Sequence, residues 1–258
     1  MRLMKRILSA AAVLALSASL LVGCSSGTAS SVPVSASSAA ESTVSSVEET
    51  ASSAVDENEA AAAQLLNDLT GSYQELWPVI LADEYKQTWL DDCTALVGED
   101  NAEAAFEKLS SMVTGDVYGE DAVEAYANGG GAYFCGFTND LATLTFDGET
   151  STISGTDKDG NVLFSHAYHY IGMEPVRGLY EFQSDDADSG EFTYFFLAPD
   201  TSAETYHIEF RYGSDAEALS QYDTGEYAYW LASGISTDCD QTMIDNCIEL
   251  FCTENLAG

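Results

Sequence analysis

The sequence is short of positive charge. Its 258 residues include only eight Lys and Arg against 43 Asp and Glu, which gives a formal net charge of −35. Three of the eight, Arg2, Lys5 and Arg6, lie in the first six residues. A surface this acidic repels phosphate backbones, so nucleic-acid binding is excluded. It also attracts cations diffusely, and that attraction alone does not indicate a specific site.

Residues with catalytic chemistry are few and lack pattern. The chain has three His and no G-x-S-x-G, H-E-x-x-H or phosphate-binding glycine loop, so we expect no enzyme. Five Cys follow Cys24 without a C-x-x-C spacing, and an odd number leaves at least one thiol without a partner in the chain. The sequence leaves open whether two of these cysteines form a single long-range disulfide. Cys247 and Cys252, five apart in a predicted helix, point to different faces and are not expected to bridge each other.

The first 24 residues are typical of an export signal. A basic start is followed by an apolar run over 7–22, too short to span a bilayer comfortably. The run ends in "LVGC", which resembles the lipobox of bacterial lipoproteins, with cleavage before Cys24 and a lipid on its thiol. We therefore predict a protein that is extracytoplasmic and lipid-anchored to the bacterial cell membrane.

The next segment, 25–57, is rich in Ser and Ala and has no aromatic residue. Nothing in it offsets the entropy of ordering, so we predict a disordered tether. Residues 58–258 are long enough for one domain with a real core. After the signal only Lys86, Lys108, Lys158, Arg177 and Arg211 oppose the acidic residues.

The domain is predicted to be α+β. Apolar spacing indicates helices up to Thr70, at 83–98, at 99–115 and at 119–131. From Ala132 the period becomes two, and seven short strands are predicted at 132–138, 141–147, 150–156, 161–171, 177–184, 191–199 and 204–213. Tight turns between them favour an antiparallel meander that closes into a barrel. The end, from 215, is predicted as a helical C-terminal tail.

Four stretches, in this order, resemble the ZinT/YodA family of zinc-binding, lipocalin-like (calycin) domains. They are "LTGSYQELWPVI", "VRGLYEFQ", "FTYFFLAPDTSAETYHIEFRYG" and "ALSQYDTGEYAYWLASGI". The resemblance covers roughly 69–235. It implies a calycin-like barrel that binds Zn²⁺ near its mouth through three histidines, captures zinc outside the cell and works with a metal-uptake transporter.

The family's three histidines do not carry over. Their positions align with Phe195, Thr205 and His207, so only one imidazole remains. Three neutral imidazoles would suit Zn²⁺, and one with Phe and Thr does not make that site. The strand "TYHIEFRYG" nevertheless places Thr205, His207, Glu209 and Arg211 on one face, which we expect to be the inward face of the barrel.

Three interpretations of this row stay open. His207 binds metal with substitute ligands, Glu209 or His166; or His207, Glu209 and Arg211 recognise a small polar or anionic ligand, with Thr205 beside them; or the row satisfies itself and fixes the barrel. His166 and His169, three apart on a strand, face opposite sides. Two acidic turns, 157–161 and 185–191, have the residues of a calcium loop but also of ordinary hairpin turns.

The sequence therefore predicts a lipid-anchored binding protein outside the cytoplasm, with divalent metal, zinc first, as its ligand. The alternative is a small-molecule or partner-binding lipoprotein whose barrel has lost the zinc site.

Overall fold

The computed structural model describes residues 57–198 and 207–257. The predicted signal, the predicted lipid attachment residue Cys24, the predicted tether up to 56 and the predicted site residue Thr205 lie outside the described residues. The division into signal, tether and domain stays a prediction.

The centre of the domain is a closed barrel of eight antiparallel strands, each paired with the next along the chain. The first and last strands pair with each other and close the ring, with Tyr73 opposite Ser236. This up-and-down order confirms the predicted calycin-like barrel. The strands are β1 (Gly71–Glu75), β2 (Thr143–Asp147), β3 (Thr152–Thr156), β4 (Val162–Met173), β5 (Tyr180–Ser184), β6 (Tyr194–Leu197), β7 (His207–Gly213) and β8 (Ala232–Ser236).

Six of the seven predicted strands are present, and three predictions at the ends of the barrel were wrong. Residues 132–138 form no ladder strand, only isolated bridges at Phe134. The strand β1 was not predicted, because "GSYQE" sits between two helical patterns. The strand β8 begins inside 226–235, which was predicted as helix, and extends one residue beyond it. The barrel therefore has its first and last strands where the sequence showed helical spacing.

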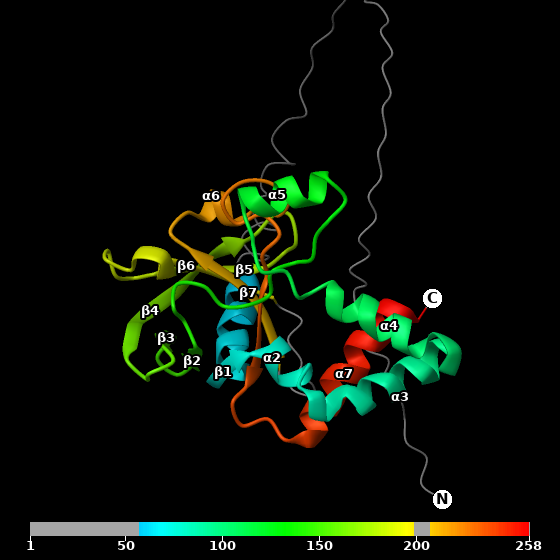
Figure 1. Cartoon of the computed structure of the whole chain (residues 1–258). Helices are drawn as coiled ribbons and strands as arrows, with labels where there is room; N and C mark the ends of the chain where they lie inside the picture. Colours follow the sequence, from blue (N-terminus) through cyan, green and yellow to red (C-terminus); the bar gives the residue numbers. More distant parts are fainter. Residues whose placement is uncertain (1–56, 199–206, 258) are drawn as a thin grey trace, which may run out of the picture. The chain divides into compact units, whose positions relative to one another are not determined.

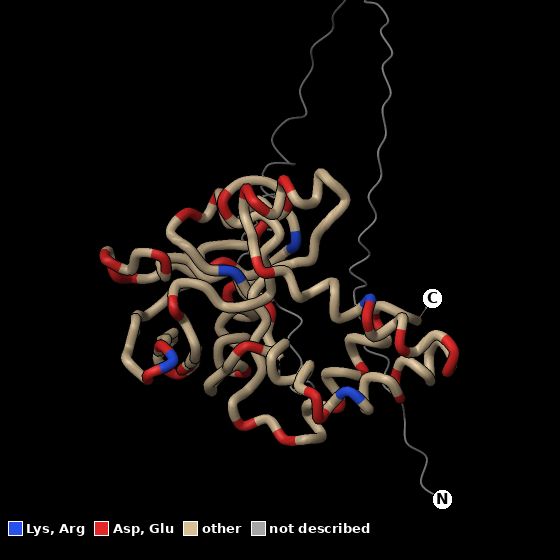
Figure 2. Tube along the Cα trace, in the orientation of Figure 1, with Lys and Arg blue, Asp and Glu red and all other residues tan. Residues whose placement is uncertain are grey.

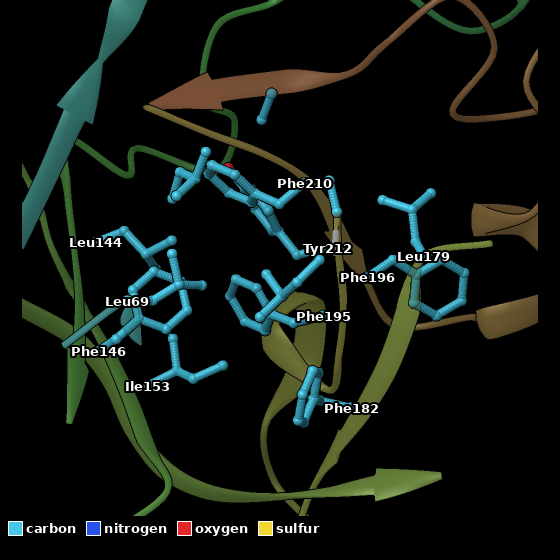
Figure 3. Packing of buried hydrophobic residues seen from close by; sticks show 14 of the residues in the cluster. Leu69, Leu144, Phe146, Ile153, Leu179, Phe182, Phe195, Phe196, Phe210 and Tyr212 are labelled. Atoms are coloured by element: carbon cyan, nitrogen blue, oxygen red, sulfur yellow. The ribbon is translucent and has the colours of Figure 1, made fainter. Parts of the chain in front are cut away.

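The barrel interior is filled by apolar side chains, many of them aromatic (Figure 3). Phe195 stacks on Tyr212 with ring centroids 5.4 Å apart, and Phe182 lies opposite Phe195 in the ladder. Segment 137–141 also contributes to this core: Phe137 packs edge-on against Phe210, and the Thr138 amide donates to the Tyr212 hydroxyl at 2.6 Å. The interior is therefore a packed core, not an open lumen.

A first helix over 57–68 precedes β1. The others are α2 (Leu76–Ile80), α3 (Lys86–Val97), α4 (Glu99–Ser111), α5 (Glu120–Ala127), α6 (Ala216–Leu219) and α7 (Gln241–Leu256). Four helices, α2, α3, α4 and α7, pack together outside the barrel and against β8, and α3, α4 and α7 lie beside one another in Figure 1. The helix before β1 and the short helix α6 instead pack against the barrel core.

Local sequence explains where several helices begin and end. The Asp240 side chain accepts from the Met243 amide and caps α7, and the Asp215 side chain accepts from the amides of Glu217 and Ala218 at α6. The helix α3 ends at Val97 and is followed by Gly98, whose φ of 85° suits glycine. Together with β8, α2, α3, α4 and α7 enclose a second core that contains Trp89, Cys93 and Cys252.

Acidic residues are spread over the surface of the described part of the chain (Figure 2). No helix among the described residues combines the length and apolar character needed to cross a membrane.

Candidate functional site

The strand β7 carries the row of polar residues that the sequence singled out. His207 lies opposite Ile235 of β8, and Glu209 lies opposite Ser233. The alternate residues Ile208, Phe210 and Tyr212 belong to the barrel core. His207, Glu209 and Arg211 therefore share one face, as predicted, but it is the outward face and not the inward one. The physical reason is volume, since the bulky apolar set fills the interior.

Arg211 is fully buried even though it faces outward. Its Nη1 donates to the carbonyls of Leu219 and Gln221, and its Nη2 donates to the carbonyl of Tyr227. The guanidinium also lies 4.4 Å from the centre of the Tyr222 ring. Burial lowers the pKa of Arg211 to about 10, so it stays protonated at neutral pH. Arg211 thus fastens segment 219–227 to the barrel, and its two terminal nitrogens already have acceptors.

Tyr222 lies between two cations. The guanidinium of Arg177 is 4.2 Å from its ring centre, on the segment that joins β4 to β5. The buried carboxylate of Glu174 accepts from the amides of Val176 and Arg177 and orders that segment. Two of the five basic residues after the signal therefore stabilise loops, which leaves less positive charge for recognising an anionic ligand.

Glu209 and His207 are half-buried, at the other end of the same face. Close to Glu209 is the thiol of Cys135, whose pKa is raised to about 12, first by burial and then by the negative charge of Glu209. Cys135 reaches this place because segment 134–136 runs beside β8, where its carbonyl accepts from the Ser233 amide at 3.0 Å. An imidazole, a carboxylate and a thiol therefore lie in one region of the outer wall.

A cavity of about 350 Å³ opens beside this region. Its walls are formed by Glu75, by residues in and next to α2, and by the segments 113–115 and 134–136, which precede and follow α5 in the sequence. Trp77, Leu81 and Phe134 give it apolar surface, and Glu75 and Cys135 give it polar groups. The Glu75 carboxylate accepts from the Phe137 amide at 2.6 Å. Sequence analysis did not single out these residues, because they come from distant segments with no shared motif.

The other two histidines lie on β4, each paired with an acidic residue. His166 lies opposite Ile153 and shares the inward face with Phe164 and Tyr168, whereas His169 faces outward. The Nδ1 of His166 is 2.7 Å from Asp186, and only 18% of its side chain is exposed. The Nδ1 of His169 is 2.6 Å from Asp185, and 54% of its side chain is exposed. The two face opposite sides, as their spacing predicts.

The three predicted metal ligands are not brought together. His207 and Glu209 lie outside the wall on β7, and His166 lies inside it on β4. The strands β5 and β6 separate the two, which at strand spacing amounts to about 14 Å around the barrel. Within 57–198 and 207–257, no three His, Cys, Asp or Glu side chains are grouped so that they could hold a metal ion. The combination of His166 with His207 is therefore corrected.

The two acidic turns use their carboxylates within the protein. Asp157 Oδ1 accepts from the amides of Asp159 and Asn161, and its Oδ2 accepts from the Asn161 side chain. These bonds with Asn161 lower the pKa of Asp157. In the second turn, Asp185 and Asp186 hold the two histidines of β4. Both segments behave as hairpin connections, and the calcium interpretation has no support from them.

Known proteins were compared with this chain by sequence and by structure. No family model and no curated protein matches the sequence. Among solved structures, the Zn(II)-bound ZinT-like domain of Streptococcus pneumoniae AdcA shares 16% identity, with a TM-score of 0.45, over 71% of this chain and 89% of that one. Zn(II)-bound AdcA from Streptococcus pneumoniae shares 15%, with a TM-score of 0.42, over 70% of this chain and 34% of its own length. The first of these is a ZinT-like domain, the family that the sequence of this chain resembles.

Proposed function

We propose that this chain is an extracytoplasmic, lipid-anchored binding protein whose ligand is a divalent metal ion, with Zn²⁺ as the first candidate. The proposed ligands are His207 and Glu209. The observation that carries the proposal is that these two side chains lie two residues apart on the outward face of β7 and are both half-buried. Imidazole nitrogen and carboxylate oxygen are both common ligands of Zn²⁺.

Both side chains can bind a metal and keep a hydrogen bond to the protein. An imidazole has two ring nitrogens, and a carboxylate has two oxygens. The guanidinium of Arg211, which follows Glu209 on the same face, is held by backbone carbonyls, so it does not have to be displaced. Cys135 is not proposed as a ligand, because burial raises the pKa of its thiol and so makes the thiolate that a metal needs more costly to form.

Two protein ligands leave at least two positions of a tetrahedral zinc to water. We therefore expect weaker binding than a site with three imidazoles would give. The proposed partner that receives the metal is a metal-uptake transporter in the same membrane.

The test is calorimetric titration of Zn²⁺ into the metal-stripped, detergent-extracted full chain. Binding of one ion per chain, lost in both His207→Ala and Glu209→Gln, is the expected result. His169→Ala is the matched control, because it removes an exposed imidazole from another strand and should change nothing. Weak binding at many sites, equal in all four proteins, would show only that 43 acidic residues attract cations.

Anchoring needs a separate test because it depends on Cys24. We expect the exported protein to carry lipid on this residue and to sediment with membranes, and Cys24→Ser to be released in soluble form. Equal membrane association of the variant would contradict the anchor.

A second candidate function is binding of a small apolar molecule in the cavity beside α2. The cavity volume of about 350 Å³ and its tryptophan and phenylalanine walls favour this ligand class. Indole is a suitable probe, and a rise in melting temperature that Leu81→Trp removes would support the candidate. No shift with indole in the parent protein would count against it.

A further inference from the structure

Two buried cysteines meet between the first and last parts of the domain. The Sγ atoms of Cys93 in α3 and Cys252 in α7 are 3.9 Å apart, and neither residue has exposed surface. They are separated by 159 positions along the chain. This contact is therefore produced by the fold and not by local sequence.

The neighbouring side chains keep α3 and α7 in close contact at this level. Trp89, one turn before Cys93, packs edge-on against Phe251 with ring centroids 6.0 Å apart, and Phe251 precedes Cys252. The Trp89 indole donates to the Ile80 carbonyl at 2.7 Å, which fixes its position. The two sulfurs thus lie in a packed layer where neither helix can easily slide.

We propose that Cys93 and Cys252 are joined by a disulfide in the exported protein. A disulfide has an S–S distance of about 2.05 Å, so the sulfurs have about 2 Å left to close, a movement of the size that rotation about χ1 produces. Cys247, five residues earlier in α7, is buried elsewhere in the same layer.

The bond forms by thiol–disulfide exchange with a disulfide oxidant, such as oxidised glutathione or an extracytoplasmic oxidoreductase. One cysteine thiolate attacks the oxidant, releases one thiol and forms a mixed disulfide. The second cysteine attacks that intermediate and releases the other thiol. The protein loses two electrons and two protons, and the S–S bond of the oxidant is reduced to two thiols.

The burial of the two thiols limits when the disulfide can form. Burial raises the pKa of both thiols in the folded protein, so neither is an effective nucleophile there. Exchange therefore takes place while α7 docks or when it opens locally. Once formed, the bond is shielded from reductants by the same packing. The bond would join α3, from the first part of the domain, to α7, from its last part, and would involve no residue of the barrel strands.

The test is peptide mapping of the full chain, purified without reductant and alkylated in denaturant. Trypsin places Cys93 alone in 87–108, and cleavage after Glu249 separates Cys252 from Cys247. We expect a cross-linked peptide pair containing Cys93 and Cys252 that dithiothreitol separates. Full alkylation of both without reductant, or a link to another cysteine, would overturn the proposal.

Stability gives a second readout that does not depend on export. The reduced protein, refolded in a glutathione redox buffer, should form the same bond, and reduction should lower the melting temperature by on the order of 10 °C. Cys93→Ala and Cys252→Ala should each abolish the response to dithiothreitol, and Cys247→Ala, the matched control in α7, should keep it. A dithiothreitol response that survives in Cys93→Ala would also overturn the proposal. Neither experiment involves metal, so the outcome is independent of the proposed metal site. The peptide mapping rests on the proposed export, and the refolding experiment does not, so a failure of export and a failure of the disulfide can be told apart.

Discussion

The two faces of β7 differ in composition but much less in burial. The inward face has Ile208, Phe210 and Tyr212, all buried in the barrel core. The outward face has His207, Glu209 and Arg211, of which Arg211 is as deeply buried as Phe210. Strand alternation therefore separates two sets of side chains, but it does not say that the polar set is exposed. The outward set is covered by segment 219–227 at one end and is half-buried at the other.

The largest effect is expected from emptying the inward face. Phe210→Ala removes a ring that packs against Phe137, Phe195 and Tyr212, and the interior has no other group to fill the space. We expect the free energy of unfolding to fall by about 3–5 kcal/mol, measured by urea denaturation. A loss below about 1 kcal/mol would mean that the barrel interior is not packed.

A smaller but still large effect is expected from Arg211 on the outward face. Arg211→Met leaves the carbonyls of Leu219, Gln221 and Tyr227 without their donor inside the protein. We expect a loss of about 2–4 kcal/mol in unfolding free energy by the same method. Arg211→Lys should rescue little, because an ammonium cannot reproduce the planar fork of donors. Full rescue by lysine would show that charge, and not geometry, holds the segment.

The open end of the outward face can be tested through pH. The Cys135 thiol has a pKa of about 12 in the folded protein against 9.0 for an ordinary cysteine, so the unfolded chain loses this proton first. The stabilisation is complete below pH 9 and is lost as the pH rises towards 12. Cys135→Ala should therefore make the alkaline loss of stability less steep.

The contribution of Glu209 to this pKa can be isolated. In Glu209→Gln, the Cys135 thiol should ionise at a lower pH. The ionisation is measured by the absorbance of the thiolate at 240 nm. An unchanged titration would place the Glu209 carboxylate too far from Cys135 to act on it.

The smallest effect is expected on β4, where the same inward–outward contrast involves two histidines. His169→Ala removes an exposed pair with Asp185 and should change unfolding free energy by at most about 0.5 kcal/mol. His166→Ala should cost about 1–2 kcal/mol, because this imidazole is mostly buried and stacks on Phe164. Equal effects would remove the distinction between the two faces of β4.

The sequence predicted the middle of the barrel well and its ends poorly. Turns at Asp147-Gly148 and Asp159-Gly160 separate strands that alternate clearly, so β2 to β7 were found. The residues of β8, "ASGIS", are small and follow an aromatic run with helical spacing, so only the pairing with β1 and β7 identifies them as a strand. Such pairing comes from tertiary structure and leaves little trace in local pattern.

The candidate site was predicted only as a set of residues on one face. Alternation placed His207, Glu209 and Arg211 together correctly. Alternation could not tell which face was inward. The other face of the strand has Ile208, Phe210 and Tyr212, and such a set could also have packed on the outside of the barrel. Nor could alternation show that His166 lies across two strands from β7, or that Cys135 comes next to Glu209, since both depend on how the barrel closes.

Closure of the barrel by β1 and β8 sets the order in which this protein can fold. Thr237 donates from its hydroxyl to the carbonyl of Ser72, 165 positions earlier, next to the strand pairs that complete the ring. When the chain is made from its N-terminus, β1 cannot pair with β8 until almost the last residues have been added. Pairing between segments so far apart in the sequence is slow. A chain that ended before 232 would keep two unpaired strand edges, so we expect premature termination to give aggregation and not a smaller folded protein.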